Sequence, residues 1–406
     1  MSFANPAPAI DDRLAKRNAL LLAMAQAVGA ASASIVIISG SLVGYMLLDE
    51  SKSWATVPVS AMVLGTAIGT LPAGMIMRRF GRRVGFMGAC LVAVLAGLLA
   101  AFAIFIEDFL LFSIGAALTG FANAFAQQYR FAAADTASDA FKPKAISWVM
   151  AGGVLAGIVG PQTVIWTKDA FDPILFAGTY VAQAGLALVA LMFVAFLKIP
   201  KPAYVRGAPT GGRPLREILR QPRFIVSAAC AVTTYALMSL VMTATPLAMI
   251  ACGLSETDAA LGIQWHVLAM FGPSFFTGSL IARFGKERIV AIGLALLAGC
   301  SIVALMGLDL AHFWIALVLL GLGWNFGFIG ATAMLTETYR PEERNMVQAT
   351  NDFFVFGVVA FASFSSGQLL DVFGWATINW MVFPFVVLCM VLLGWLLTHE
   401  RRNLPV

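Results

Sequence analysis

Two neighbouring apolar stretches carry side chains that could bind a soft metal ion. Met238 and Met242 are four residues apart in the first stretch, and His266 and Met270 are four residues apart in the second. Residues at this spacing lie on one face of a helix, so each pair presents two ligands in the same direction. Neutral thioether sulfur and imidazole suit copper, whereas magnesium and calcium require oxygen ligands. The two pairs therefore indicate a copper site, if the helices that carry them face each other.

The depth of the two pairs agrees with this interpretation. If one helix rises from near Phe224 and the next descends from near Thr257, a rise of about 1.5 Å per residue places all four side chains in the central third of a membrane. Consecutive antiparallel helices would let the pairs meet. Methionine is also an adaptable filler of apolar cores, and the spacing leaves both interpretations open.

Further groups extend the hypothesis. Cys230 and Cys252 flank the methionine pair on the same helix and are candidates for passing the ion on, with plain packing as the alternative. The five cysteines include no CxxC pair, so we expect no disulfide framework. Asp352 is a candidate partner for Arg78 or Arg79 in an inner gate, although pairing at the membrane interface is the simpler interpretation.

The composition places the chain in a membrane. Of its 406 residues, 60% are hydrophobic and 12% are charged, about half the charged share of a soluble protein. We therefore predict an all-α membrane protein whose first span is retained rather than removed as a signal peptide. Its twelve expected transmembrane helices run near residues 18–48, 54–77, 84–106, 109–133, 145–167, 173–197, 224–251, 257–282, 288–308, 311–335, 346–369 and 375–398.

A basic segment rich in proline and glycine divides the chain. We expect a six-helix bundle in residues 1–197, a linker in 198–223, and a second six-helix bundle in 224–406 that would carry the metal site.

The charges of the loops predict the orientation. Of the 26 Lys and Arg, 23 lie in segments on the side of the N-terminus. The other three are Lys52, Lys168 and Arg130. By the positive-inside rule, both termini and the linker are cytoplasmic in a multi-pass protein of the cell inner membrane. The net charge of +5 comes from these loops, so we expect the lipid bilayer as a partner and no nucleic acid.

The two halves repeat a loop motif. Gly74-Met-Ile-Met-Arg78-Arg79-Phe-Gly-Arg-Arg follows the second span, and Gly278-Ser-Leu-Ile-Ala-Arg283-Phe-Gly-Lys follows the eighth. The first copy resembles the motif G-x-L-A-D-R-x-G-R-R of the major facilitator superfamily, with Arg78 in place of the usual Asp. This resemblance implies two parallel six-helix halves and transport by alternating access.

Within that superfamily, a MxxxM pattern on the seventh helix followed by HxxxM on the eighth resembles the CcoA-like copper importers of bacteria. Met238, Met242, His266 and Met270 match this pattern position by position. The resemblance implies that copper is the imported substrate, that it supplies the assembly of cbb-type cytochrome c oxidase, and that a cytoplasmic copper acceptor exists. We expect a monomer with no resident cofactor.

Two other functions remain open. The chain has no catalytic constellation and no P-loop pattern, so we expect a transporter rather than an enzyme. The first alternative is a proton-linked carrier of a small organic solute or drug, whose cavity the methionines and histidine would line. Proton-coupled carriers generally use a mid-membrane carboxylate, and the predicted spans show none near their middle. The second alternative, a sensor that keeps the fold, has no extra soluble domain to support it.

Overall fold

The computed structural model describes residues 12–48, 52–135, 137–138, 141–199, 212–340 and 343–402, and their regular elements are helices. The N-terminal bundle consists of α1 (Asp12–Gly29), α2 (Ala31–Met46), the 3-10 turn η1 (Lys52–Trp54), α3 (Val57–Phe80), α4 (Arg82–Phe105), α5 (Phe109–Ala126), α6 (Tyr129–Asp135), α7 (Lys142–Thr167) and α8 (Ala177–Ala195). The C-terminal bundle consists of α9 (Leu215–Leu219), α10 (Pro222–Ala251), α11 (Glu256–Phe271), α12 (Ser274–Phe284), α13 (Lys286–Met306), α14 (Leu310–Leu335), α15 (Arg344–Trp380) and α16 (Val382–Arg402).

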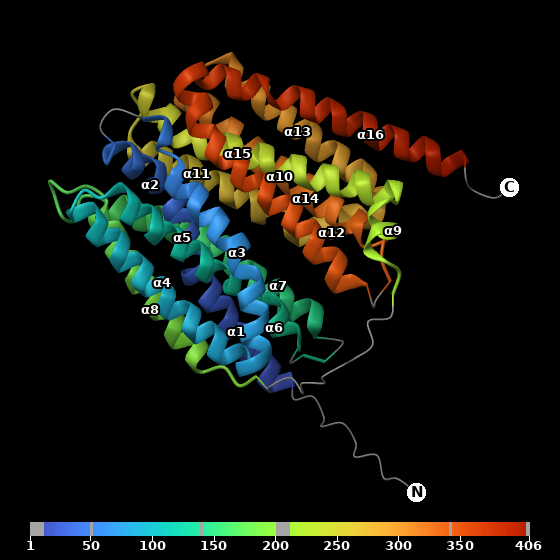
Figure 1. Cartoon of the computed structure of the whole chain (residues 1–406), viewed down its shortest axis with the longest axis horizontal. Coiled ribbons are helices and arrows are strands. Elements are labelled where there is room, and N and C mark those ends of the chain that lie inside the picture. The colour runs from blue at the N-terminus through green and yellow to red at the C-terminus, as the bar shows by residue number, and fades with distance from the viewer. Residues whose placement is uncertain are drawn as a thin grey trace, which may run out of the picture.

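The predicted all-α membrane fold is confirmed. Ten stretches of the described residues are long and apolar enough to cross a membrane, and the bent pair α11–α12 makes an eleventh. One of the ten, Met346–Glu400, has 55 residues, more than twice the roughly 20 that one crossing needs. Gly374 interrupts it with φ 77°, a left-handed conformation that glycine adopts without strain. The chain turns back there before α16 (Figure 1), so this stretch supplies two crossings and brings the eleven to the predicted twelve.

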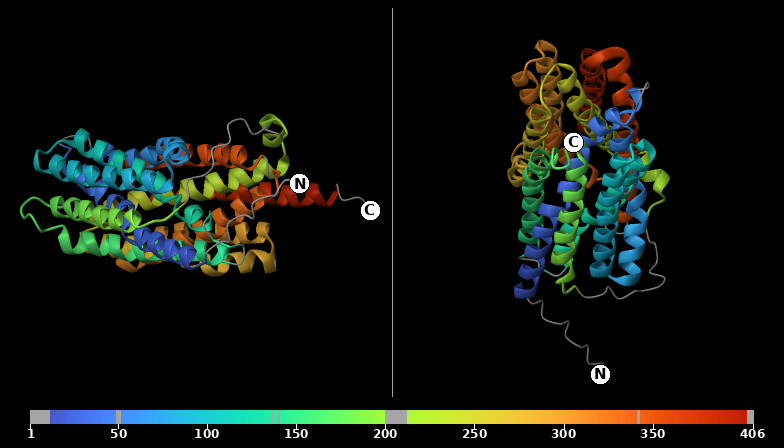
Figure 2. Two further views of the ribbon diagram at one scale, coloured as in Figure 1. Left: turned by 90° about the horizontal axis from the view of Figure 1, so that it is seen from below. Right: turned by 90° about the vertical axis from the view of Figure 1, so that its left-hand side faces the viewer.

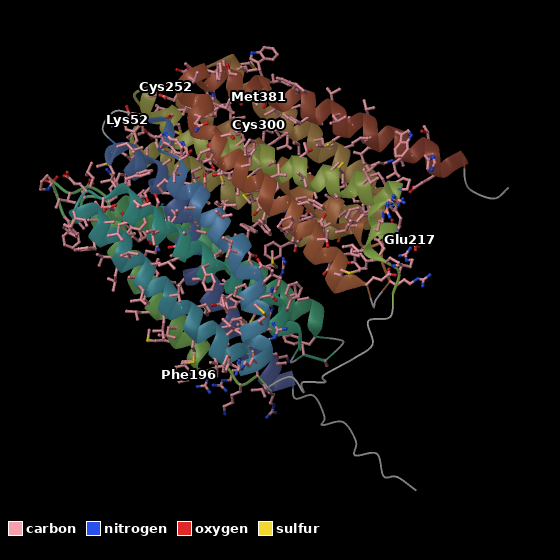
Figure 3. The ribbon with its side chains drawn as sticks, viewed as in Figure 1. Lys52, Phe196, Glu217, Cys252, Cys300 and Met381 are labelled. Carbon is pink, nitrogen blue, oxygen red and sulfur yellow. The ribbon has the colours of Figure 1, made fainter. Side chains whose placement is uncertain are left out.

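The two bundles occupy separate sides of the molecule (Figures 1 and 2). One end of the bundles, here called the basic end, holds the start of α1, the end of α16 and the turns between α3 and α4 and between α12 and α13. Figure 3 shows Phe196 and Glu217 toward this end and Lys52 and Cys252 at the opposite end. Residues 200–211 of the predicted linker lie outside the described residues, so the proposed division of the chain at 198–223 stays a prediction.

Large apolar side chains cover the outside of both bundles. Trp166 on α7 and Phe353 on α15 are 77% and 76% exposed. Lipid tails solvate such side chains, while the helices satisfy their own backbone hydrogen bonds. Many buried positions of the helices are instead alanine or glycine, which lets neighbouring backbones approach closely.

The bundles contact each other toward the end opposite the basic end. Ser60 near the start of α3 donates a hydrogen bond to Ser363 of α15 at 3.2 Å. Closer to mid-membrane, the Gln162 side-chain amide of α7 donates to the Gln264 side-chain oxygen of α11 at 3.0 Å. Toward the basic end the two bundles diverge (Figure 1).

A pair of charges attaches the segment before α9 to the start of α15. The Arg213 guanidinium donates to both carboxylate oxygens of Glu343, at 3.0 and 2.8 Å, and the Arg213 backbone N–H donates to the same side chain at 2.7 Å. These hydrogen bonds from Arg213, and one from the Arg340 backbone, hold the pKa of Glu343 at about 2, well below its usual 4.5. A carboxylate with a depressed pKa stabilises the folded state above its unfolded pKa.

Acidification is therefore expected to remove this stabilisation. At neutral pH the wild type should melt at a higher temperature than Glu343→Gln, which cannot accept the charge-assisted hydrogen bonds. The difference in melting temperature should shrink as the pH falls from about 4.5 toward 2, because the folded-state carboxylate is protonated in that range. Thermal melts of both purified proteins across this range measure it. A difference that stays constant down to pH 2 would contradict the assigned role of Glu343.

Candidate functional site

The four predicted copper ligands lie inside the C-terminal bundle, away from lipid. Met238 and Met242 of α10 and His266 and Met270 of α11 are each at most 7% exposed, and the three methionines belong to the same apolar core. The His266 Nδ1 atom lies 2.9 Å from the Leu317 carbonyl of α14. Because a carbonyl only accepts hydrogen bonds, Nδ1 carries the proton and Nε2 is the acceptor. This Nε2 is buried, with no hydrogen-bond partner in the described part of the chain.

The two cysteines proposed for ion transfer lie in different surroundings. Cys230 is fully buried beside Cys389 of α16, whose thiol donates to the Ala229 carbonyl at 3.8 Å. Cys252 is exposed where α10 ends, at the end opposite the basic end (Figure 3). Among the described residues, no group of three or more His, Cys, Asp or Glu side chains could hold a metal ion. The transfer role of both cysteines stays a prediction.

The eighth predicted span is broken between α11 and α12, which meet at an angle of 43°. Asn325 of α14 bridges the break, since its amide donates to the Met270 carbonyl at 2.6 Å and to the Ser274 hydroxyl at 2.8 Å. Its side-chain oxygen accepts from the Thr277 hydroxyl at 2.6 Å. Pro273 at the break has no backbone N–H to offer. Broken spans whose backbone groups are satisfied in this way are typical of transporter binding sites.

Beside this break, aromatic rings from four helices meet. Trp324 and Phe328 of α14 stack with centroids 5.3 Å apart and an interplanar angle of 17°. Tyr235 of α10 sets its edge against both, at 5.3 and 5.1 Å, and against Phe356 of α15 at 5.8 Å. Phe271, the last residue of α11, packs against Trp324 at 6.0 Å. These five residues are called the aromatic cluster below.

The aromatic cluster lies near the middle of the membrane. Tyr235 follows the start of α10 by 13 residues and Phe356 follows the start of α15 by 12, which places both about 18–20 Å from the basic end. Trp324 follows the start of α14, at the other end, by 14 residues, or about 21 Å. The aromatic cluster is therefore about equally far from both ends of the bundles.

Two opposite charges lie between the aromatic cluster and the basic end. Arg130 belongs to α6 of the N-terminal bundle, and Asp352 belongs to α15 of the C-terminal bundle. The two side chains attract each other electrostatically, and both charges also act on the Tyr235 hydroxyl. The Arg130 Nε atom is buried without a hydrogen-bond partner in the described residues. From the sequence, pairing at the membrane interface was the simpler interpretation for Asp352, whereas the structure brings it to the boundary between the bundles.

Among the side chains that the structure describes, the predicted gate is not formed. The Arg79 guanidinium lies over the Phe80 ring, 5.3 Å from its centroid, and the Arg78 side chain lies outside the described residues. Contact of Asp352 with Arg79 requires the bundles to approach at the basic end, so the gate stays a prediction.

Sequence reasoning missed the aromatic cluster. The i,i+4 spacing of Trp324 and Phe328 is the same signal that singled out the methionines, and it places both rings on one helix face. The cluster needs three further helices, however, and spacing within one helix does not show which faces of distant helices meet.

Comparisons with known proteins agree with a transporter. The sequence pattern of the Major Facilitator Superfamily matches residues 19–303 and 228–406. The riboflavin transporter RfnT of Brucella anthropi is 54% identical over 385 residues, which cover 94% of this chain and 96% of that protein. The uncharacterized MFS-type transporter YddS of Bacillus subtilis is 28% identical and covers 85% of this chain and 83% of its own.

The fold also matches a solved structure. A mutant of the nucleoside transporter NupG superposes with a TM-score of 0.73 over 94% of this chain and 99% of its own, at 13% identity. At that identity, the likeness shows the fold alone.

The copper-importer prediction is wrong. The relative at 54% identity is a riboflavin transporter, which overturns copper as the transported ion, the supply of copper to cytochrome oxidase assembly and the cytoplasmic copper acceptor. The CcoA-like branch likewise has no support. Neither the structure nor the comparisons test Met238, Met242, His266 and Met270 as ligands. The transported copper ion that they were proposed to bind is, however, no longer supported. Their burial in the core agrees with the alternative of adaptable packing.

The broader predictions are confirmed. The family pattern spans nearly the whole chain, the relatives are transporters rather than enzymes, and transporters of this family need no cofactor. The apolar helices cross a membrane several times. The chain belongs to the major facilitator superfamily.

Proposed function

We propose that this chain carries riboflavin across the bacterial cytoplasmic membrane by alternating access. The observation that carries the proposal is the 54% identity, over almost the full length of both chains, to a riboflavin transporter. This is the organic-solute alternative of the sequence analysis, with a substrate assigned to it.

The aromatic cluster supports this substrate. Riboflavin is uncharged and has a flat three-ring system, so a carrier can hold it by stacking and hydrogen bonds rather than by a strong charge. Trp324, Phe328 and Tyr235 offer ring surface at mid-membrane depth, and aromatic side chains gain from offset stacking and edge contacts.

The same proposal assigns the orientation and the state. By the positive-inside rule the basic end is cytoplasmic, so a molecule whose bundles contact each other near Ser60 and Ser363 is closed toward the periplasm. Rocking of the bundles would close the basic end, where Asp352 would meet Arg78 or Arg79, and open the other end.

The test is growth and uptake. A bacterium that cannot synthesise riboflavin and lacks its own transporter should grow on a low riboflavin concentration when it expresses this chain, and membrane vesicles should accumulate radiolabelled riboflavin. The empty vector is the control for growth, and cellular copper should be the same with and without the chain. Failure to rescue growth while folded protein is present in the membrane would overturn the proposal.

A further inference from the structure

We infer that the substrate ring stacks on the aromatic cluster beside Trp324 while its imide edge, an N–H between two carbonyls, is held by Arg130 and Asp352. This inference rests on the proposed function and assigns the residues that would recognise the substrate. It places one recognition group on the N-terminal bundle and the others on the C-terminal bundle.

Two buried hydrogen-bond donors without partners point to a ligand. Trp324 is 7% exposed, and its indole N–H has no acceptor in the described part of the chain. The Nε atom of Arg130 is likewise buried and has no acceptor among the described residues. Leaving a buried donor unpaired is costly, and few native groups are left so. Acceptors supplied by a bound molecule between the bundles would satisfy both.

The two charges complement an imide. The Arg130 guanidinium has only donors, and the Asp352 carboxylate has only acceptors. An imide edge presents acceptor, donor and acceptor in a row, so its carbonyls can accept from Arg130 while its N–H donates to Asp352. The Asn351 amide lies 3.4 Å from one Asp352 oxygen and leaves the other oxygen for the substrate. Hydrogen bonds to ionised groups are stronger than neutral ones, so this edge would contribute strongly to selectivity.

The arrangement couples binding to the motion of the bundles. Arg130 belongs to α6, and Asp352, Tyr235 and Trp324 belong to three helices of the other bundle. A ligand held by both sets favours the states in which the sets are close, because it binds those states more tightly. In the empty carrier, these two sets are linked by the direct attraction between Arg130 and Asp352.

The experiment compares riboflavin with its analogue methylated at the imide nitrogen. Equilibrium binding to the purified full-length chain should be at least about tenfold tighter for riboflavin, because a site built to hydrogen-bond an N–H rejects a ligand that lacks it. In Asp352→Asn this ratio should fall, since the neutral amide oxygen of asparagine is a weaker acceptor than the carboxylate. The matched control is Asp371→Asn, on the same helix but exposed, which should keep the wild-type ratio. The ratio does not depend on how much of each protein is folded.

The ring contact is tested in the same assay. Trp324→Leu should weaken riboflavin binding roughly tenfold, in the range of stacking losses for nucleobases, and should reduce the quenching of flavin fluorescence on binding. Trp324→Phe keeps a ring but removes the N–H, so it should bind riboflavin more tightly than Trp324→Leu and less tightly than the wild type. Trp166→Leu removes a tryptophan that is 77% exposed and should change neither.

The outcomes separate this inference from the proposed function. If the wild type binds riboflavin and its methylated analogue equally, or if Asp352→Asn keeps the wild-type ratio, the inference is overturned and riboflavin transport stands. If riboflavin does not bind but uridine does, the proposed function fails and the imide site is supported, because uridine carries the same edge. If neither ligand binds, both proposals are overturned.

Discussion

Replacing Gly120 by leucine is expected to remove folded protein from the membrane. Gly120 of α5 faces α3, and a Cβ atom there would lie 1.8 Å from the Met62 carbonyl oxygen and 2.7 Å from its carbon. The atoms that the Cβ would meet belong to the Met62 backbone, so no side-chain rotation can relieve the clash. The two helices would have to separate, which also breaks the hydrogen bond from the Thr66 hydroxyl to the Gly120 carbonyl at 3.1 Å.

Alanine at the same position should be harmful as well, by more than the roughly 1–3 kcal/mol of ordinary overpacking. Gly88 of α4 is the matched control, because a Cβ there meets nothing within 4 Å. Gly88→Ala should leave stability unchanged or raise it by up to about 1 kcal/mol, since alanine favours helices over glycine. Yield and melting temperature of the detergent-purified proteins measure both changes. Equal behaviour of Gly120→Ala and Gly88→Ala would contradict the close packing of α3 and α5.

Much of this fold could be predicted because the bilayer constrains a chain so strongly. Runs of apolar residues must form helices to satisfy their backbones in lipid, and the loop charges separate the two ends. The details that escaped prediction depend on single residues. The break between α11 and α12 lies at Gly272 and Pro273. Asn325 of another helix stabilises it by hydrogen bonds to polar groups on both sides of the break. No pattern within the eighth span indicates that partner.

The candidate site was harder to predict because it is assembled from separate helices. Met238 and His266 satisfied a spacing rule within their own helices, yet the same rule describes any buried helix face. The His266 ring instead hydrogen-bonds to the carbonyl of Leu317, which is 51 residues further along the chain on another helix. Arg130 and Asp352 are 222 residues apart and come within electrostatic reach of each other only because the two bundles pack together. The substrate of a carrier depends on which residues from distant parts of the chain come together.

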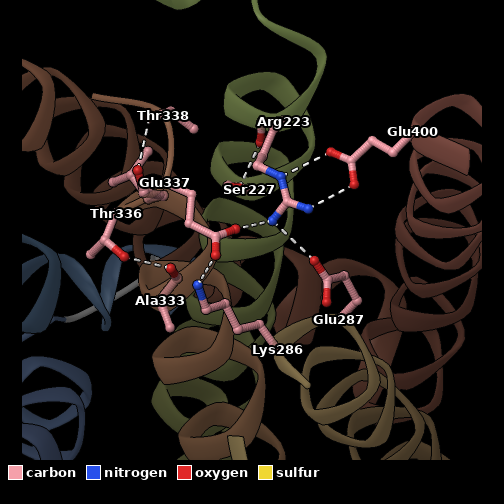
Figure 4. Close-up of polar contacts among 10 residues, drawn as sticks. Arg223, Ser227, Lys286, Glu287, Ala333, Thr336, Glu337, Thr338 and Glu400 are labelled. Carbon is pink, nitrogen blue, oxygen red and sulfur yellow. Dashed lines mark hydrogen bonds and ion pairs between the residues drawn. The ribbon is translucent and has the colours of Figure 1, made fainter. Parts of the chain in front are cut away.

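Replacing Arg223 by alanine is expected to destabilise the C-terminal bundle at its basic end. Arg223 of α10 lies among three carboxylates (Figure 4). Its guanidinium donates to both oxygens of Glu400 at 2.9 and 2.7 Å, lies 3.0 Å from Glu287 and also pairs with Glu337. These partners belong to α16, α13 and the turn after α14, so one side chain ties four parts of the bundle together.

The loss should exceed that of a single surface ion pair, which is about 0–1 kcal/mol, because removal of Arg223 leaves carboxylates facing one another. Lys286, which pairs with Glu337, remains as the nearby cation. Adding Glu287→Gln to Arg223→Ala should therefore recover part of the lost melting temperature, although it removes a further charged partner. Arg223→Lys keeps the charge but loses the two-pronged contact with Glu400, so it should fall between wild type and alanine.

The control for this prediction is Arg216→Ala, an exposed arginine of α9, which should leave the melting temperature unchanged. The defect of Arg223→Ala should also depend on salt, because added ions screen the remaining carboxylates from one another. Thermal melts of the single and double variants at low and high salt measure both effects. If the double variant melts below Arg223→Ala, repulsion among the carboxylates is not the cause, and the arginine acts through its contacts alone. The acidic residues on α13 and α16 belong to helices that pack toward α10 rather than toward the N-terminal bundle. The folded fraction of each variant should therefore bind riboflavin with the same affinity as the wild type.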